Sequence, residues 1–211
     1  MQLLFVSDYV CPYCLVAREA LQQALAECSL PVQVTWQPFE LTPEPRERVD
    51  TYHDAERRAR YRVLEEPCRW LGLDMKLPPR VAPRPYTRLA FEGWFYACEQ
   101  GRGEEYSDLV YRAYFVEEQD IGSLDILVSL AEQVGLDGAD FKLALEEGRY
   151  TEKERQAVTY AREVLKPQGV PTLYFDGQKI SLSDYTEAEM LRALNDAASC
   201  AQGHFCGPEG C

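Results

Sequence analysis

The fold of this chain is decided near its N-terminus by residues 3–14, LLFVSDYVCPYC. The short apolar run LLFV is typical of a strand that is buried on both faces, and it leads directly into a Cys-Pro-Tyr-Cys tetrapeptide. The following residues, 15–27, contain no Gly or Pro. Leu21, Leu25 and Cys28 recur at helical spacing, so we expect a helix whose apolar stripe packs on a sheet.

A second strand follows this predicted helix. Pro31 ends the helix. Val32, Val34 and Trp36 then alternate with polar residues, which is the period of a strand with one buried face. The first part of the chain therefore predicts a strand–helix–strand unit, with the dithiol between the first strand and the helix.

The middle of the chain has almost entirely helical signals. From Pro43 to Gly148 the pattern predicts four or five helices, separated by Gly and Pro residues. Thr151 and Glu154 then have the spacing of a capping box, which predicts the start of a further helix.

A hairpin and a last helix complete the pattern. Residues 172–175 and 178–181 are predicted strands, joined by an Asp-Gly turn at residues 176–177. Thr186 and Glu189 form a second capping box, ahead of a helix that should end near residue 198.

The order of these elements predicts one α/β domain with an insertion, because the strands on either side of the helical block need each other to complete a sheet. The predicted segments are 1–42 and 151–198 for the two parts of the sheet domain, 43–150 for the all-helical insertion and 199–211 for a Cys-rich C-terminal tail.

Composition limits the function. The 211 residues include 22 Lys and Arg against 35 Asp and Glu, a net charge of −13, which argues against nucleic acid or an anionic membrane surface as the partner. We find neither a secretory signal pattern at the N-terminus nor an apolar run long enough for a membrane span, so we expect a cytoplasmic protein. Eight cysteines in such a reducing compartment suggest catalysis, metal binding or burial before structural disulfides.

The position of Cys11 and Cys14 favours redox chemistry. Cys11 falls at the N-cap of the predicted helix and Pro12 at its first position, where a missing N–H costs nothing. The positive end of the helix dipole favours a thiolate at Cys11, the attacking thiol, and Cys14, one turn later, can resolve a mixed disulfide. The alternatives are a zinc site and two chance surface thiols. A zinc site usually needs four ligands, and no second cysteine pair at the spacing of a zinc knuckle lies nearby.

The chain resembles the FrnE-type branch of the DsbA-like thioredoxin-fold proteins. The resemblance rests on the segments DYVCPYC (8–14), PFEL (38–41) and GVPT (169–172), and on the helical insertion. It implies a thioredoxin fold with a large helical insertion and a thiol–disulfide oxidoreductase that needs no cofactor. It also implies that Pro171 is cis and lies against the dithiol, and that the backbone of Val170 binds an extended substrate segment. The cis form is accessible because it costs little before proline.

Two other function classes remain open. Kappa-class glutathione transferases and hydroxychromene carboxylate isomerases resemble this chain in fold and insertion, although they typically carry serine at the attacking position. The second cysteine favours disulfide exchange with thiol- or disulfide-containing proteins, and glutathione is a possible reductant. The third class is a non-enzymatic metal-binding or chaperone-like module. Oligomeric state and net direction of exchange are not indicated by the sequence.

The C-terminal tail carries a dense group of sulfur and imidazole ligands: Cys200, His204, Cys206 and Cys211. Cys206 and Cys211 bracket a Gly- and Pro-containing turn, and some FrnE-like proteins carry a similar C-terminal Cys-x4-Cys pair, so one interpretation is a second redox pair. The rival interpretations are a small zinc site and a tail with no ordered structure.

Further titratable residues are candidates for a supporting role. Asp8 and Glu40 either lie buried near the dithiol, where they would relay or tune its proton, or are solvated ends of loops. Cys28, Cys68 and Cys98 lie in helical segments rich in apolar residues, so we expect them in the core.

Overall fold

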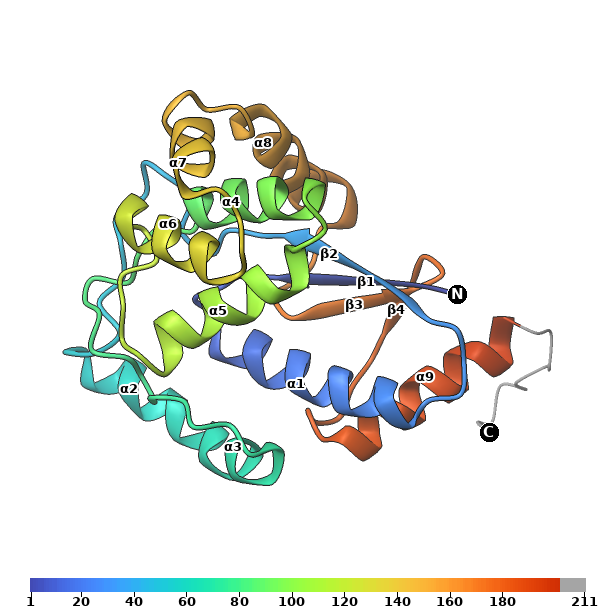
Figure 1. The fold of residues 1–211 in the computed structure, drawn as a ribbon. Coiled ribbons are helices and arrows are strands. Elements are labelled where there is room, and N and C mark those ends of the chain that lie inside the picture. The colour runs from blue at the N-terminus through green and yellow to red at the C-terminus, as the bar shows by residue number, and fades with distance from the viewer. Residues whose placement is uncertain (202–211) are drawn as a thin grey trace.

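The computed structural model describes residues 1–201 and contains one mixed sheet with the strand order β2-β1-β3-β4 (Figure 1). The strands are β1 (Gln2–Ser7), β2 (Gln33–Pro38), β3 (Thr172–Phe175) and β4 (Gln178–Ile180). β1 pairs in parallel with β2 and antiparallel with β3, so Phe5 lies between Trp36 and Leu173. The pairing of β1 with β3 brings together segments that are some 170 residues apart in the chain.

The predicted β-hairpin is confirmed. β3 and β4 pair antiparallel and are joined by Asp176 and Gly177, both of which have positive φ values, 45° and 85°. Two successive residues with positive φ match the two-residue turn that follows the twist of a hairpin, which explains the Asp-Gly dipeptide.

Two helices share one side of the sheet. α1 (Pro12–Glu27) and α9 (Glu187–Ala201) pack against each other below the strands in Figure 1. The helix predicted after the second capping box is confirmed, because the Thr186 hydroxyl accepts a hydrogen bond from the Glu189 N–H at 3.2 Å.

The other elements lie above the sheet or to one side of it (Figure 1). They are α2 (Ala55–Tyr61), the 3₁₀ helix η1 (Arg62–Leu64), α3 (Glu65–Leu71), α4 (Arg88–Glu99), α5 (Gly103–Phe115), α6 (Leu124–Gln133), α7 (Gly138–Glu146), α8 (Thr151–Tyr160) and the π-helical turn η2 (Ala161–Leu165). Residues 43–150 thus form six α-helices and one 3₁₀ helix instead of four or five helices. The difference arises because α2 and α3 are short helices of seven residues each.

Thr151 does not cap α8 as predicted. Its hydroxyl donates instead to both carboxylate oxygens of Glu92, at 3.1 Å, and Tyr150 occupies the N-cap position. The tertiary contact between α8 and α4 thus takes the place of a local capping interaction.

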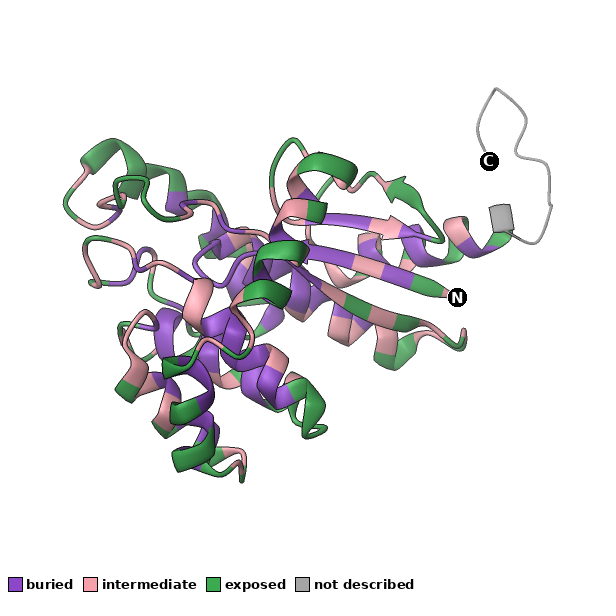
Figure 2. Ribbon diagram, turned by 90° about the horizontal axis from the view of Figure 1, so that it is seen from above, coloured by how far each residue is buried: buried purple, intermediate pink, exposed green. Residues whose placement is uncertain are grey.

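A continuous core joins the sheet to the helical insertion. Figure 2 shows buried residues along the strands and on the inner faces of the helices. Tyr106, Tyr114, Phe115 and Phe141 are among the largest side chains with no exposed surface, and all come from the insertion. α4 and α5 contact each other, and buried residues of both belong to the same core as the buried residues of β1.

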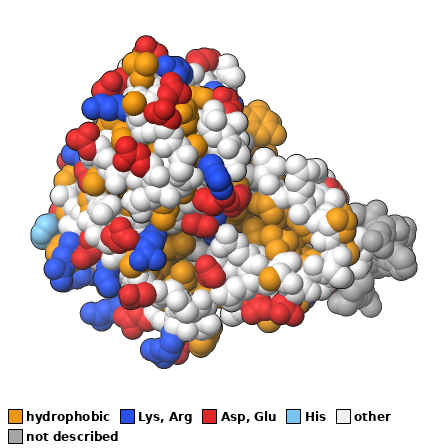
Figure 3. Space-filling model, in the orientation of Figure 1, with side chains coloured by type: hydrophobic (Ala, Val, Ile, Leu, Met, Phe, Trp, Pro, Cys, Tyr) orange, Lys and Arg blue, Asp and Glu red, His pale blue; other side chains and the backbone are white. Residues whose placement is uncertain are grey.

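The surface carries charges of both signs. Figure 3 shows Asp and Glu interspersed with Lys and Arg on the face in view. Among the described residues, no helix combines the length and the apolar composition that are needed to cross a membrane.

Candidate functional site

Cys11 lies at the junction between β1 and α1. It has the extended backbone of an N-cap residue (φ −91°, ψ 114°), and Pro12 begins the helix. The Cys14 N–H donates to the Cys11 carbonyl at 3.0 Å, which closes the first turn. The Cys11 side chain makes no capping hydrogen bond. As the N-cap residue, Cys11 lies at the positive end of the helix dipole.

Cys14 differs from Cys11 in its surroundings. Both cysteines are buried free thiols, but 3% of Cys11 is exposed and none of Cys14 is. Burial raises the pKa of the Cys14 thiol well above its ordinary value, and the hydrogen bond to Cys11 and the charge of Cys11 raise the pKa further. Cys14 therefore keeps its proton at a higher pH than an ordinary thiol does.

The Val170–Pro171 peptide bond is cis, as predicted. The Cys11 thiol donates to the Val170 carbonyl oxygen at 3.4 Å, although the two residues are 159 positions apart. The pairing of β1 with β3 produces this contact, since Val6 lies opposite Thr172 at the end of the ladder. A groove of about 430 Å³ runs beside this loop and β4 as far as Tyr185.

This arrangement coincides with a family match over most of the chain. A model of the DSBA-like thioredoxin domain matches residues 2–195. The chain belongs to the DsbA-like thioredoxin domain family. The predicted fold class, a thioredoxin fold with a helical insertion, is thereby confirmed.

Known proteins similar to this DsbA-like chain cover between 79% and 100% of it. The uncharacterized protein YwbO of Bacillus subtilis (strain 168) is 44% identical over 167 residues, which are 79% of this chain and 82% of YwbO. The structure of a probable DsbA oxidoreductase from Streptomyces coelicolor has a TM-score of 0.80 and 25% sequence identity. The match covers 100% of this chain and 98% of the Streptomyces chain. A 2-hydroxychromene-2-carboxylate isomerase has a TM-score of 0.74, 16% identity and coverages of 96% and 98%, and shows the fold alone.

Three tyrosines surround the dithiol of this DsbA-like protein. Tyr13 and Tyr185 have ring centroids 6.2 Å apart, and the Tyr13 hydroxyl donates to the main chain of α2. Burial raises the pKa of Tyr13, Tyr61 and Tyr185, and the charge of Cys11 raises each of them further. These phenols therefore stay neutral near neutral pH. Only Tyr13 lies within a motif that the sequence reveals.

Asp8 is buried beside the dithiol, so the interpretation as a solvated loop end is wrong for this residue. Its carbonyl oxygen accepts from the Cys11 N–H at 3.1 Å, and its Oδ2 accepts from the Leu41 N–H at 2.7 Å. Oδ1 is buried and has no partner among the described residues. Burial raises the pKa of Asp8, and the Leu41 N–H and the Arg84 charge oppose that rise.

Glu40 is also buried, with 4% of its surface exposed. The structure places it beside Glu154 of α8, a residue that the sequence analysis did not single out. Burial raises the pKa of both carboxyl groups, and that of Glu154 reaches about 8 because the negative charge of Glu40 adds to the effect. No sequence pattern links these residues, which are more than 100 positions apart.

The remaining cysteines differ in exposure. Cys68 is buried, as predicted, whereas Cys28 is only partly buried at the C-cap of α1. The prediction for Cys98 is wrong: it is exposed near the end of α4, where its sulfur lies against Gly103 at the start of α5. A helix end exposes positions that the helical period would place inside.

The tail residues His204, Cys206 and Cys211 lie outside the described part of the chain, and Cys200 is described only as part of α9. Within the described residues, no group of three or more His, Cys, Asp or Glu is arranged to hold a metal ion. The choice between a second redox pair, a zinc site and an unordered tail therefore stays open.

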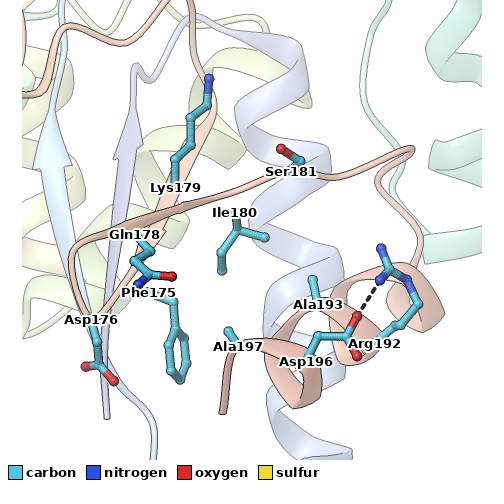
Figure 4. A pocket seen from close by; sticks show the side chains of 10 residues that line it. All are labelled: Phe175, Asp176, Gln178, Lys179, Ile180, Ser181, Arg192, Ala193, Asp196 and Ala197. Carbon is cyan, nitrogen blue, oxygen red and sulfur yellow. Dashed lines mark hydrogen bonds and ion pairs between the residues drawn. The ribbon is translucent and has the colours of Figure 1, made fainter. Parts of the chain in front are cut away.

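A second hollow lies on the other side of β4. It has a volume of about 310 Å³ and is lined by the β3–β4 hairpin and α9 (Figure 4). Phe175, Ile180 and Ala193 give it an apolar floor, and the ion pair between Arg192 and Asp196 (2.5 Å) lies at its edge. Its lining contains no thiol.

Proposed function

We propose that this protein is a thiol–disulfide oxidoreductase of the FrnE-type branch, acting on protein or small-molecule disulfides through Cys11 and Cys14. The observation that carries the proposal is the asymmetry of the pair. Cys11 lies at the N-terminus of α1 and contacts the Val170 carbonyl with 3% of its surface exposed, whereas Cys14 has no exposed surface and its raised pKa keeps it protonated. One thiol is thereby suited to attack and the other to resolve.

In the reductive direction the proposed reaction has two exchange steps. The Cys11 thiolate attacks one sulfur of the substrate disulfide, forms a mixed disulfide and expels the first substrate thiolate. Cys14 then loses its proton to Asp8 and attacks the Cys11 sulfur, which expels the second substrate thiolate. Two electrons pass from the dithiol to the substrate, and the Cys11–Cys14 disulfide remains. The oxidative direction is the exact reverse.

We assign substrate binding to the loop at Val170 and Pro171. The groove beside this loop borders Tyr185 and β4, the edge strand of the sheet. An extended peptide segment can pair with exposed main-chain groups whatever its side chains, which suits an enzyme with many substrates. Glutathione is small enough for the same groove, and it remains a candidate reductant.

The glutathione-dependent transferase or isomerase is the alternative function. The fold alone does not separate the two, because both a 2-hydroxychromene-2-carboxylate isomerase and the cytosolic disulfide reductase DsbM from Pseudomonas aeruginosa have similar folds. The resolving thiol at Cys14 supports disulfide exchange, since a glutathione transferase needs no second cysteine. The cytoplasmic location stays a prediction from the sequence.

Reductant-dependent turnover of insulin disulfides tests the proposal. We expect activity in the wild type, none in Cys11→Ser, and trapped mixed disulfides in Cys14→Ser. Cys98→Ser is the matched control, because it removes an exposed thiol outside the proposed site and should leave the rate unchanged. Turnover with dithiothreitol supports a general oxidoreductase, whereas turnover only with glutathione supports the alternative. No turnover with either reductant would reject the proposed oxidoreductase.

Alkylation of the reduced native protein tests the division of roles separately. At neutral pH we expect Cys11 to be modified before Cys14, because burial raises the pKa of the Cys14 thiol. If Cys14 were modified first, the assignment of attacker and resolver would have to be reversed.

We further propose that Cys206 and Cys211 form a reversible disulfide that exchanges electrons with the Cys11–Cys14 pair, within the chain or between chains. Cys206 lies five residues beyond the end of α9, and an extended chain spans about 3.3 Å per residue. A double Cys206→Ser, Cys211→Ser variant should reoxidise the Cys11–Cys14 pair more slowly than the wild type. Unchanged kinetics would reject the exchange, and the loss of stoichiometric zinc from the variant would support the metal site instead.

A further inference from the structure

The hollow between the β3–β4 hairpin and α9 follows the open edge of the sheet. β4 pairs with β3, and its other edge has no strand beside it among the described residues. Residues 178–181, which are β4 and the residue after it, all line the hollow. Successive residues of a strand point to opposite faces, so a hollow lined by all of them runs along the strand edge. Proteins usually cover such an edge, because its free main-chain groups can pair with another chain.

The floor of this hollow is apolar and partly uncovered. In Figure 4 the apolar side chains lie toward one another: Phe175, Ile180, Ala193 and Ala197. Ile180 and Ala197 are only partly buried, so apolar surface stays open on both the hairpin and α9. The hollow has a volume of about 310 Å³. An apolar cavity of about 150 Å³ can already hold a benzene ring, so one aromatic side chain fits here.

The charged side chains around the hollow already have partners. Arg192 is paired with Glu189 at 2.8 Å and with Asp196 at 2.5 Å. The Asp176 carboxylate accepts from a main-chain N–H of β1 at 2.8 Å. The Lys179 side chain points away from the apolar floor (Figure 4). A charged occupant therefore gains no new ion pair at the floor, which favours a neutral, apolar one.

The chain itself supplies such a segment directly after α9. Residues 202–206 read QGHFC and carry no formal charge while His204 is neutral. Phe205 is the only large apolar side chain in residues 202–211. A neutral segment with one aromatic ring thus matches a hollow that has an apolar floor and room for one ring.

The distance along the chain allows this contact. α9 ends at Ala201, and Phe205 lies four residues further on. At 1.5 Å per helical residue, Ala197 lies about 6 Å back along α9 from Ala201, whereas four extended residues span about 13 Å. Gly203 lies between the two ends and makes a sharp reversal of the main chain accessible.

A second copy of this chain is the rival occupant of an open strand edge. Its net charge of −13 argues against that contact, because two strongly acidic proteins repel each other. Residues 202–206 are joined covalently to α9, so their effective concentration at the hollow is high whatever the protein concentration. Both arguments favour the chain's own segment.

We propose that residues 202–206 fold back over this hollow, with the Phe205 ring on the apolar floor and the main chain beside the open edge of β4. The hollow and the groove beside Val170 share residues 179–181, so a segment seated here leads toward that groove. The docking does not depend on the redox role of either cysteine pair.

Hydrogen exchange of the full chain, followed by mass spectrometry, tests the proposal with Phe205→Ser as the variant. The amides of residues 178–181 should exchange about tenfold faster in the variant, because burial of a phenylalanine side chain contributes that factor or more to a docking equilibrium. Phe205→Leu keeps an apolar side chain and should lie between the two. The control is Leu143→Ser, which removes an exposed apolar side chain from α7 on the opposite side of the sheet (Figure 1) and should exchange like the wild type.

Nuclear Overhauser contacts between the Phe205 ring protons and the Ile180 methyl groups provide a readout that needs no variant. We expect these contacts in the wild type. Their absence, or equal exchange of residues 178–181 in wild type and Phe205→Ser, would overturn the proposal. Protection that rises with protein concentration in both proteins would assign the hollow to a second copy and would also overturn it. No readout measures turnover, so the docking and the proposed oxidoreductase function are tested separately.

Discussion

Replacement of Glu154 by Gln should flatten the dependence of protein stability on pH. In the folded protein, burial and the neighbouring Glu40 raise the pKa of Glu154 from 4.5 to about 8. Between these two values the folded state binds more protons than the unfolded state, so the free energy of unfolding falls as the pH rises. The free energy of unfolding that is lost between these two pH values is the free energy needed to ionise Glu154 inside the folded protein.

The structure sets an upper limit on the effect. At about 1.4 kcal/mol per pH unit, a rise from 4.5 to about 8 corresponds to roughly 5 kcal/mol across the window. Relaxation of the protein and entry of water around the ionised pair reduce this value, so we expect a measured loss of about 2 kcal/mol between pH 5 and pH 8. The Gln variant carries no proton that titrates and should lose much less.

Urea unfolding at fixed temperature and ionic strength, at several values between pH 5 and pH 8, measures the slope. Glu152→Gln is the matched control on α8. The hydrogen bonds from Arg155 and Gln156 lower the pKa of Glu152 to about 2, so its contribution is complete above 4.5 and is lost only as the pH falls toward 2. Equal slopes in the wild type and Glu154→Gln would refute the account of the buried pair.

Three further substitutions test the packing and the chemistry. Gly93→Ala should lower the free energy of unfolding by about 1–3 kcal/mol, because the new methyl group would overlap the Tyr106 hydroxyl. An unchanged midpoint of chemical denaturation would contradict this packing. Arg18→Met should lower the free energy of unfolding by only about 1–2 kcal/mol, although Arg18 is buried. Its two carboxylate partners are about half exposed, so they regain water when the guanidinium group is removed. A loss above about 3 kcal/mol would show that these carboxylates do not regain water. Asp8→Asn should slow the attack of Cys14 on the mixed disulfide by about tenfold or more in stopped-flow exchange, and an unaffected rate would exclude Asp8 as the proton acceptor.

Local features of the sequence predicted the framework of the site correctly. An apolar run before Cys11 and a Gly- and Pro-free stretch after it predicted β1 and most of α1. The Asp-Gly dipeptide predicted the hairpin turn, and Thr186 predicted the start of α9. These features are readable because strand period, helix capping and turn geometry depend on residues within a few positions of one another.

The packing and the buried carboxyl pair depended on the tertiary structure. Cys98 fits the helical pattern of a core residue but is exposed near a helix end, and Thr151 has capping spacing but bonds to Glu92 instead. Glu154 lies in an α8 sequence rich in charged residues that otherwise face solvent. The sequence by itself determined the elements, the dithiol and its position at a helix N-terminus. Only the tertiary structure decided that Glu40 and Glu154 meet out of water, because burial and long-range contacts, not local spacing, set the ionisation of a carboxyl group.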